Sequence, residues 1–169
     1  MRKEHGANGF DAATFRVMND LTLADFAAED LGPLLTMWRD SFEAGVGIKD
    51  PHPLAEQIEY FWSEVAPKHR VCVARCGGHL VGFVAASAES VAQLYVRVGH
   101  QRQGIGSALL GWAKGQSSGG LWLYTFAQNS NARAFYEKHG FRATAHGFEP
   151  SWQLADVRYE WSLGEAAPT

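Results

Sequence analysis

The stretch from Val91 to Phe126 constrains the fold most, because it reads as strand, glycine-containing turn, helix and strand in direct succession. Residues 91–98 (VAQLYVRV) and 121–126 (LWLYTF) are rich in the β-branched and aromatic residues typical of strands. The intervening residues predict a helix, because apolar side chains recur on one helical face at Ile105, Ala108, Leu109, Trp112 and Ala113. A strand–helix–strand unit requires a crossover connection. The second strand is apolar throughout, so we expect it to be covered on both faces.

Periodicity and turn residues predict the remaining elements. Two β-rich runs within 70–87 flank Gly77-Gly78, which predicts a hairpin. Helical spacing predicts one helix over 29–42 and a second with its apolar face on Leu54, Ile58, Phe61, Trp62 and Val65. The other predicted segments are strands over 21–26, 141–146 and 156–162, a helix over 129–139 with Asn129 as N-cap and Gly140 as its stop, loops over 44–53 and 146–155, and a segment over 14–18 that is either a short strand or irregular.

Together these segments predict a single α/β to α+β domain over residues 14–163, with a loose arm over 1–13 and a frayed tail over 164–169. The early strands form a meander, and the later strand–helix–strand unit adds the crossover. We therefore expect a mixed, mostly antiparallel sheet of about six to seven strands, with about four helices distributed over both faces.

Composition and charge exclude several classes of function. A net charge of −3 argues against nucleic-acid binding, which favours a basic face. The sequence has no apolar run of about 20 residues, and its polar start lacks the apolar core of a signal peptide, so we expect a cytoplasmic protein with no membrane span. Cys72 and Cys76 would lie about 13 Å apart along a strand, too far for a disulfide. His69 and His79 lack zinc-ligand spacing, so we expect no metal.

The turn before the predicted helix contains Gly104 and Gly106, two poor helix formers. A helix N-terminus offers unpaired N–H groups and a partial positive charge, and glycines let a ligand approach them, which suits a phosphate or diphosphate. The alternative is a tight turn with close packing of helix and strand. The turn is neither a P-loop, because no Gly-Lys-Ser/Thr follows, nor the dinucleotide fingerprint, whose third glycine position holds Leu109.

The sequence LYVRVGHQRQGIGSALL resembles the acetyl-CoA-binding signature of the GNAT superfamily of N-acetyltransferases. The matching residues are Leu94-Tyr95-Val96, followed by Gln101-x-x-Gly104-x-Gly106. Farther along the chain, NSNARAFYEKHGF resembles a second motif of the family. The matching residues are Asn129, Ala132, Phe135, Tyr136, Glu137, Lys138, Gly140 and Phe141. One departure is Val98, where relatives usually carry proline. The order of elements over residues 21–162 also fits the family.

The resemblance implies acetyl-CoA as co-substrate and assigns its binding residues. The strands over 91–98 and 121–126 would be a parallel, splayed pair, and the pantetheine arm would pair with backbone near Leu94, Tyr95 and Val96. Asn129 would cap its helix, contact the arm, or both, and Arg133 either reaches a phosphate or is an ordinary surface arginine. The diphosphate would be held by backbone N–H groups of Gln101, Arg102, Gln103, Gly104, Ile105, Gly106 and Ser107.

The resemblance also implies direct transfer of acetyl from sulfur to a primary amine in a ternary complex. Tyr136 matches the position that protonates the departing thiolate, although its helical spacing alone would make it a core residue. Glu89 is the first candidate for the general base, directly or through water, unless it is a solvated loop carboxylate. Glu160 is the second candidate.

The acceptor would meet the 44–53 loop, the second helix and the 146–155 loop. His146 and Glu149 would face it, and Trp62 and Trp152 either wall the pocket or serve packing. The acceptor would be a small molecule or a peptide, and family members often form homodimers. Two alternatives remain: a catalytically silent module that binds or senses acyl-CoA, and a nucleotide-phosphate binder of another fold.

Overall fold

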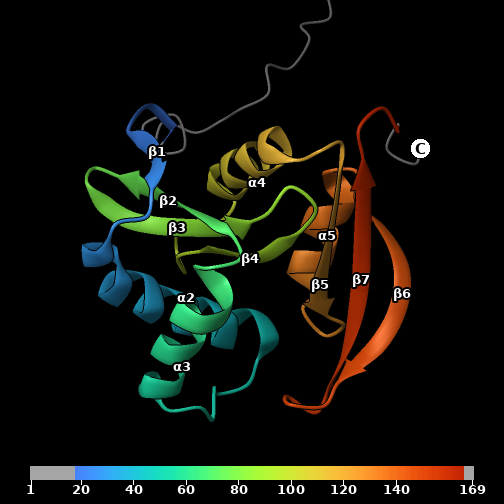
Figure 1. Ribbon diagram of the computed structural model, residues 1–169, viewed down its shortest axis with the longest axis horizontal. Coiled ribbons are helices and arrows are strands. Elements are labelled where there is room, and N and C mark those ends of the chain that lie inside the picture. The colour runs from blue at the N-terminus through green and yellow to red at the C-terminus, as the bar shows by residue number, and fades with distance from the viewer. Residues whose placement is uncertain (1–17, 166–169) are drawn as a thin grey trace, which may run out of the picture.

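The computed structural model describes residues 18–165 and contains seven strands (Figure 1). Of the segment over 14–18, only Met18 is described, and it lies in a helical turn; the arm over 1–13 lies outside the described residues. The elements in chain order are β1 (Leu21–Asp25), a 3₁₀ turn (Ala28–Asp30), α2 (Leu31–Val46), α3 (Leu54–Tyr60), a π-helical turn (Phe61–Val65), β2 (Arg70–Cys76), β3 (His79–Ala86), β4 (Val91–Val96), α4 (Ile105–Gln116), β5 (Gly120–Phe126), α5 (Ser130–Lys138), β6 (Arg142–Glu149) and β7 (Leu154–Ser162).

The strands form two antiparallel sheets, in the orders β1-β2-β3-β4 and β5-β7-β6. They meet at one parallel bridge between Ser90 and Trp122, where the Trp122 N–H donates to the Glu89 carbonyl at 3.0 Å. Beyond this bridge β4 and β5 form no ladder. The predicted mixed α/β fold is confirmed, and its parallel pair touches only at the start of the two strands.

The β2–β3 hairpin turns at Gly77 and Gly78, as predicted. Their φ angles are +56° and +81°, which other residues rarely adopt. Cys76 therefore lies opposite His79, and the register runs back to the pair Arg70–Ala86. This register decides which β2 side chains face each helical layer.

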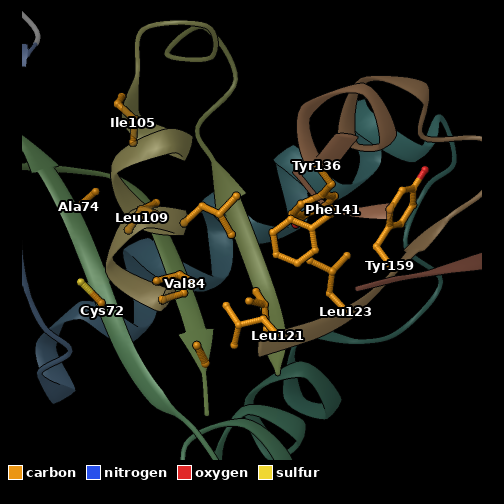
Figure 2. Packing of buried hydrophobic residues seen from close by; sticks show 14 of the residues in the cluster. Cys72, Ala74, Val84, Ile105, Leu109, Leu121, Leu123, Tyr136, Phe141 and Tyr159 are labelled. Atoms are coloured by element: carbon orange, nitrogen blue, oxygen red, sulfur yellow. The ribbon is translucent and has the colours of Figure 1, made fainter. Parts of the chain in front are cut away.

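Helices cover both faces of the β1–β4 sheet, α2 and α3 on one and α4 on the other (Figure 1). Along β2, Val71 and Val73 pack in the cluster that contains α2, whereas Cys72 and Ala74 pack in the cluster that contains α4. Figure 2 shows this second core continuing from Leu109 of α4 to the residues of the β5–β7 sheet. Burial raises the pKa of the Cys72 thiol to about 11, and the two cysteines form no disulfide.

The prediction for the apolar face of the second helix is partly wrong. Phe61 and Val65 are buried as predicted, but Leu54, Ile58 and Trp62 are exposed and Gln57 is buried in their place. The helix ends in a π-helical turn, which is wider than an α-turn and changes the direction in which successive side chains point. The face that packs on the core is therefore rotated from the one that regular α-spacing gives.

The expectation that the fifth strand is covered on both faces is also wrong. Trp122 is 37% exposed and Tyr124 is 54% exposed. Within the described residues, no helix covers this face; the Arg158 guanidinium instead lies 4.8 Å and 5.8 Å from the two ring centroids. Aromatic surface on this face is thus shielded by a cation rather than by a helix.

Both predicted loops are shorter than expected. Helix α2 extends to Val46 and ends at Gly47, whose φ is +82°. The segment over 146–155 is mostly a β-hairpin, with only residues 150–153 between β6 and β7. The hairpin strands pair Glu149 with Leu154.

We predict that Gly82→Ala destabilises the fold by about 1–3 kcal/mol. A methyl group at Gly82 would lie 2.9 Å from the Tyr95 carbonyl oxygen and 3.0 Å from Leu109 Cδ1, so β3, β4 or α4 must move. The matched control is Gly111→Ala, because nothing lies within 4 Å of that position and alanine favours a helix by about 0.5–1 kcal/mol. Urea denaturation measures both variants; equal stability of Gly82→Ala and wild type would contradict this packing.

Candidate functional site

The gap between β4 and β5 presents main-chain groups of β4 that β3 does not use. The Arg97 N–H donates to the Val81 carbonyl at 2.7 Å, which fixes the phase of the antiparallel ladder. Because hydrogen-bonded and non-hydrogen-bonded pairs alternate, Leu94 and Val96 direct their N–H and C=O groups away from β3. The Ser41 hydroxyl confirms this phase, since it donates to the Val96 carbonyl at 2.9 Å.

The opposite wall of the gap follows from the pairing of β5 with β7. The Ala127 N–H donates to the Ala155 carbonyl at 2.8 Å, so the alternating positions Tyr124 and Phe126 direct their main-chain groups toward β4. The Phe126 carbonyl accepts from the Asn129 N–H at 3.0 Å. Among the described residues, no hydrogen bond engages the Tyr124 and Leu94 groups that face the gap. Such groups cost free energy when buried, and a ligand with amides would satisfy them.

A cleft of about 900 Å³ opens from this gap and passes between α2, α3 and the β6–β7 hairpin. At the gap it is lined by Leu94, Tyr95, Asn129 and Tyr136. Farther out, aromatic residues form much of its wall, namely Trp38, Phe42, Phe126 and Trp152.

The two tryptophans predicted as walls or packing residues differ in position. Trp152 lines the cleft and also anchors its loop, with its ring centroid 4.6 Å from Phe42 and 4.7 Å from His52. Trp62 does not line the cleft; it is exposed and packs its edge against Phe26 and Phe61.

Tyr136 is both a core residue and a wall of the cleft. Figure 2 shows its side chain beside Phe141 and Tyr159, and the residue is 7% exposed. Burial, and to a smaller extent the nearby Tyr95, raise the pKa of the Tyr136 phenol well above its usual range. Burial likewise raises the pKa of Tyr95 to about 12. Both phenols therefore keep their protons at neutral pH.

The turn over 99–107 exposes consecutive N–H groups at the start of α4. Gly99, Arg102 and Gly104 have φ angles of +87°, +62° and +85°, which curl the chain tightly. Ala108 is the first residue of α4 whose N–H forms a hydrogen bond within the protein; it donates to the Gly104 carbonyl at 3.0 Å. In the described part of the chain, the N–H groups of residues 101–107 donate to no other residue. This arrangement can bind an anion.

The two glycines of the turn serve different purposes. A methyl group at Gly106 would lie 3.2 Å from the Phe135 ring, so Gly106 permits the close packing of α4 on α5. Gly104 has a positive φ, and a methyl group there would lie 2.8 Å from the Met18 sulfur, so Met18 rests against the turn. The packing alternative that the sequence left open therefore applies to Gly106.

The remaining residues predicted to bind the cofactor are partly engaged within the protein. Asn129 lines the cleft and caps α5, its Oδ1 accepting from the Ala132 N–H at 3.1 Å. Arg133 does not line the cleft; its Nε donates to the Tyr159 hydroxyl at 3.2 Å. Ser107 Oγ lies 2.9 Å from His139 Nε2, which leaves its N–H for a ligand.

The structure does not bring the predicted bases together with Tyr136. Glu89 is exposed in the turn before β4 and does not line the cleft. Glu160 accepts from Arg158 Nε at 2.8 Å on the exposed sheet face, and His146 is exposed on β6. Of the predicted acidic and histidine residues, only Glu149 lines the cleft.

Sequence reasoning missed the other ionisable residues of the cleft. Besides Glu149 these are Arg39, Asp50, His52, Glu56 and Asp156. Asp50 and His52 lie in the loop that was expected to meet the acceptor, but no local pattern marks Glu56 or Asp156. Within residues 18–165, no cluster of three or more His, Cys, Asp or Glu side chains could hold a metal ion, and no helix is long and apolar enough to cross a bilayer.

Comparisons with known proteins agree on the kind of domain. Residues 67–143 match the family model described as an acetyltransferase (GNAT) domain. Apo YjaB from Escherichia coli is similar in structure, with a TM-score of 0.70 and 20% identity over 85% of this chain and 99% of that chain. No curated protein sequence matches the chain significantly.

Two further solved structures were determined with a cofactor. PaiA N-acetyltransferase from Thermoplasma acidophilum, in complex with coenzyme A, has a TM-score of 0.62 and 22% identity over 84% of this chain and 98% of that chain. YncA, a putative acetyltransferase from Salmonella typhimurium with acetyl-CoA, has a TM-score of 0.65 and 17% identity over 89% of this chain and 98% of that chain. The family resemblance predicted from the two motifs is confirmed.

We predict that Asn129→Ala lowers the free energy of unfolding by about 1 kcal/mol, because the N-cap bond to Ala132 is lost. Asn129→Asp is the matched control, since its carboxylate accepts the same bond and favours a helix N-terminus. Thermal unfolding measures both variants. Equal destabilisation by alanine and aspartate would show that the cap does not stabilise α5.

Proposed function

We propose that the protein is an acetyl-CoA-dependent N-acetyltransferase, from the premise that residues 67–143 match the GNAT acetyltransferase domain model. Its acetyl group passes directly from the CoA sulfur to a primary amine in a ternary complex. One arrangement carries the proposal: the unpaired amides of residues 101–107 follow β4, free main-chain groups of Leu94 and Tyr124 face the β4–β5 gap, and Tyr136 lines the cleft at this gap.

The residues of this arrangement fit coenzyme A, which supplies an activated thioester when bound. The N–H groups of residues 101–107 suit a diphosphate, because they sit at a positive helix end and donate to no described residue. The main-chain groups of Leu94 and Tyr124 suit the amides of a pantetheine arm. Val96 offers only its N–H, because its carbonyl already accepts from Ser41.

Tyr136 acts as the general acid in this proposal. The amine nitrogen forms a bond to the acetyl carbon as the carbon–sulfur bond breaks, and the sulfur takes the phenolic proton to leave as a thiol. The proton lost by the amine restores the phenol through solvent in the cleft. Burial favours this role, because it keeps the Tyr136 hydroxyl protonated and therefore able to donate its proton.

The acceptor must attack as the neutral amine, although a lysine-like amine is neutral in only about one molecule in 2,500 at pH 7. Glu89 remains a candidate base only through water, because it does not line the cleft. Glu149 and Asp156 do line it and are better situated to take the proton to solvent. We therefore propose proton release along the carboxylate-lined end of the cleft.

Release of free thiol from acetyl-CoA across an amine panel tests the function, and Tyr136→Phe tests the acid. We predict that this variant lowers kcat by about 10- to 100-fold and leaves acetyl-CoA affinity unchanged. In the wild type, the rate should rise with pH as the amine loses its proton. It should not fall through Tyr136 ionisation until the pH exceeds about 10, because the raised pKa holds the proton above the ordinary value.

Two results would contradict these assignments. An undiminished rate for Tyr136→Phe at saturating substrates would remove Tyr136 from the acid role. Tight acetyl-CoA binding without thiol release for any amine would support the catalytically silent alternative. Binding of nucleotides as tightly as CoA would point to a different phosphate-binding function.

The diphosphate site is tested by Gly104→Glu, which we predict to weaken CoA binding at least about 100-fold by calorimetry. The variant puts a carboxylate among the N–H groups of the turn. Gly104→Asn controls for backbone strain, because asparagine tolerates the positive φ of this residue. Gly111→Glu controls for added charge on the same helix, at an exposed position with nothing within 4 Å. Unchanged CoA affinity in Gly104→Glu would contradict the site.

A further inference from the structure

The outer end of the cleft carries an excess of negative charge. Its lining there comes from the start of α3, the loop before it and the β6–β7 hairpin. Among the described residues, four carboxylates line the cleft, namely Asp50, Glu56, Glu149 and Asp156, against a single arginine, Arg39. The chemistry of this end depends on which of these charges are already compensated.

Arg39 and Asp50 compensate each other. Arg39 Nη2 lies 3.8 Å from Asp50 Oδ2 and donates to the His52 carbonyl at 2.7 Å. Its Nε donates to Gln57 Oε1 at 3.4 Å. Asp50 also contacts His52, with 2.9 Å between Oδ1 and Nδ1. The guanidinium is therefore committed to the protein, and no other lysine or arginine of residues 18–165 lines the cleft.

The other three carboxylates form no ion pair with any described residue. Glu149 accepts only the Ser151 N–H, at 2.8 Å, which leaves its second oxygen available. Asp156 lies across the hairpin from Gly147, where a methyl group would approach its Oδ1 to 2.6 Å. A side chain at position 147 would therefore displace this carboxylate from its position beside the cleft.

These carboxylates adjoin a built cavity rather than a flat acidic surface. Tyr136 is 7% exposed and lines the cleft, and no hydrogen bond from its hydroxyl to a described residue is present. Gln57 is 8% exposed and also lines it. Tyr60 borders the same end, and the nearby Glu149 contributes to raising the pKa of its phenol after the larger effect of burial.

We propose that the acceptor is a linear diamine or polyamine whose second ammonium binds at the end of the cleft lined by the carboxylates Glu56, Glu149 and Asp156. The inference rests on the proposed function, because it assigns the acceptor end of the same site. The reacting nitrogen reaches the gap beside Tyr136 in its neutral form, while the distal nitrogen stays charged among the carboxylates. The rings of Tyr60 and Trp152 border the path between them and suit a cationic chain.

A second charge on the acceptor also helps the reacting amine lose its proton. Like charges on one short chain lower each other's pKa, so the proximal nitrogen is neutral more often. The carboxylates bind the distal nitrogen as an ammonium, so that nitrogen does not have to lose its proton. An acceptor with a distal carboxylate would instead meet three uncompensated anions and, among the described lining residues, no available lysine or arginine. The cleft therefore selects against acceptors whose far end is a carboxylate.

The test compares three acceptors with the same chain of methylenes and different far ends: cadaverine, n-hexylamine and ε-aminocaproate. Thiol release from acetyl-CoA gives kcat/KM for each. We expect cadaverine to exceed hexylamine by about tenfold and hexylamine to exceed ε-aminocaproate by a similar factor. Raising the salt from about 0.05 M to about 0.5 M should reduce both ratios, because the charges at this open end are screened.

Charge-removing variants locate the effect in the cleft. Glu149→Gln and Glu56→Gln should each reduce the cadaverine-to-hexylamine ratio of kcat/KM about threefold to tenfold, mainly through a higher KM for cadaverine. Glu59→Gln is the matched control, because Glu59 is an exposed residue of α3 that does not line the cleft. It should leave the ratio at the wild-type value.

The outcomes separate this inference from the proposed function. Failure to bind acetyl-CoA would refute the function itself. Binding of acetyl-CoA with equal rates for the three acceptors, with a preference for ε-aminocaproate, or with no turnover of any of them would refute the acceptor assignment. Equal effects of Glu59→Gln and Glu149→Gln on the ratio would also overturn it, since general surface charge would then explain the preference.

Discussion

The parting of β4 from β5 is the constraint on which the rest of the site depends. Two parallel neighbours would normally pair along their whole length, and here they pair only at Ser90 and Trp122. The main-chain groups of Leu94 and Tyr124 that point into the gap consequently have no hydrogen-bond partner among the described residues. A folded chain tolerates this only if a ligand or water satisfies those groups, because unpaired buried amides are costly.

Contacts around the gap hold it open on both sides. On one side, α2 crosses the end of β4 through the bond from Ser41 to Val96, and Gln128 donates to the Val46 carbonyl at 2.6 Å. On the other side, the missing side chain of Gly106 lets α4 pack on Phe135. The tie between Ser107 and His139 joins the same two helices. The turn that presents the N–H groups is thereby fixed to the helix that carries Tyr136.

Local sequence patterns were sufficient for the scaffold but not for the lining of the cleft. The strand–helix–strand order, the Gly77-Gly78 hairpin and the Asn129 cap all depend on short-range rules, and the structure agrees with each. The predicted apolar face of the second helix was partly wrong, because α-helical spacing in the sequence does not reveal the π-helical turn that follows α3. Glu56 and Asp156 face the cleft through tertiary packing, which brings α3 and β7 together without any shared motif. The two glycines predicted the turn from sequence alone. The structural role of Gly106, which lets α4 pack on Phe135, became visible only in the structure.

Residue-resolved amide hydrogen exchange tests most directly whether the gap accepts an amide-bearing arm. Exchange would be compared in the free protein, with coenzyme A, and with the nucleotide half of coenzyme A that lacks pantetheine. We expect both ligands to protect the N–H groups of residues 101–107, and only intact coenzyme A to protect those of Leu94 and Tyr124. Unchanged exchange at Leu94 and Tyr124 with saturating coenzyme A would contradict the account of the gap.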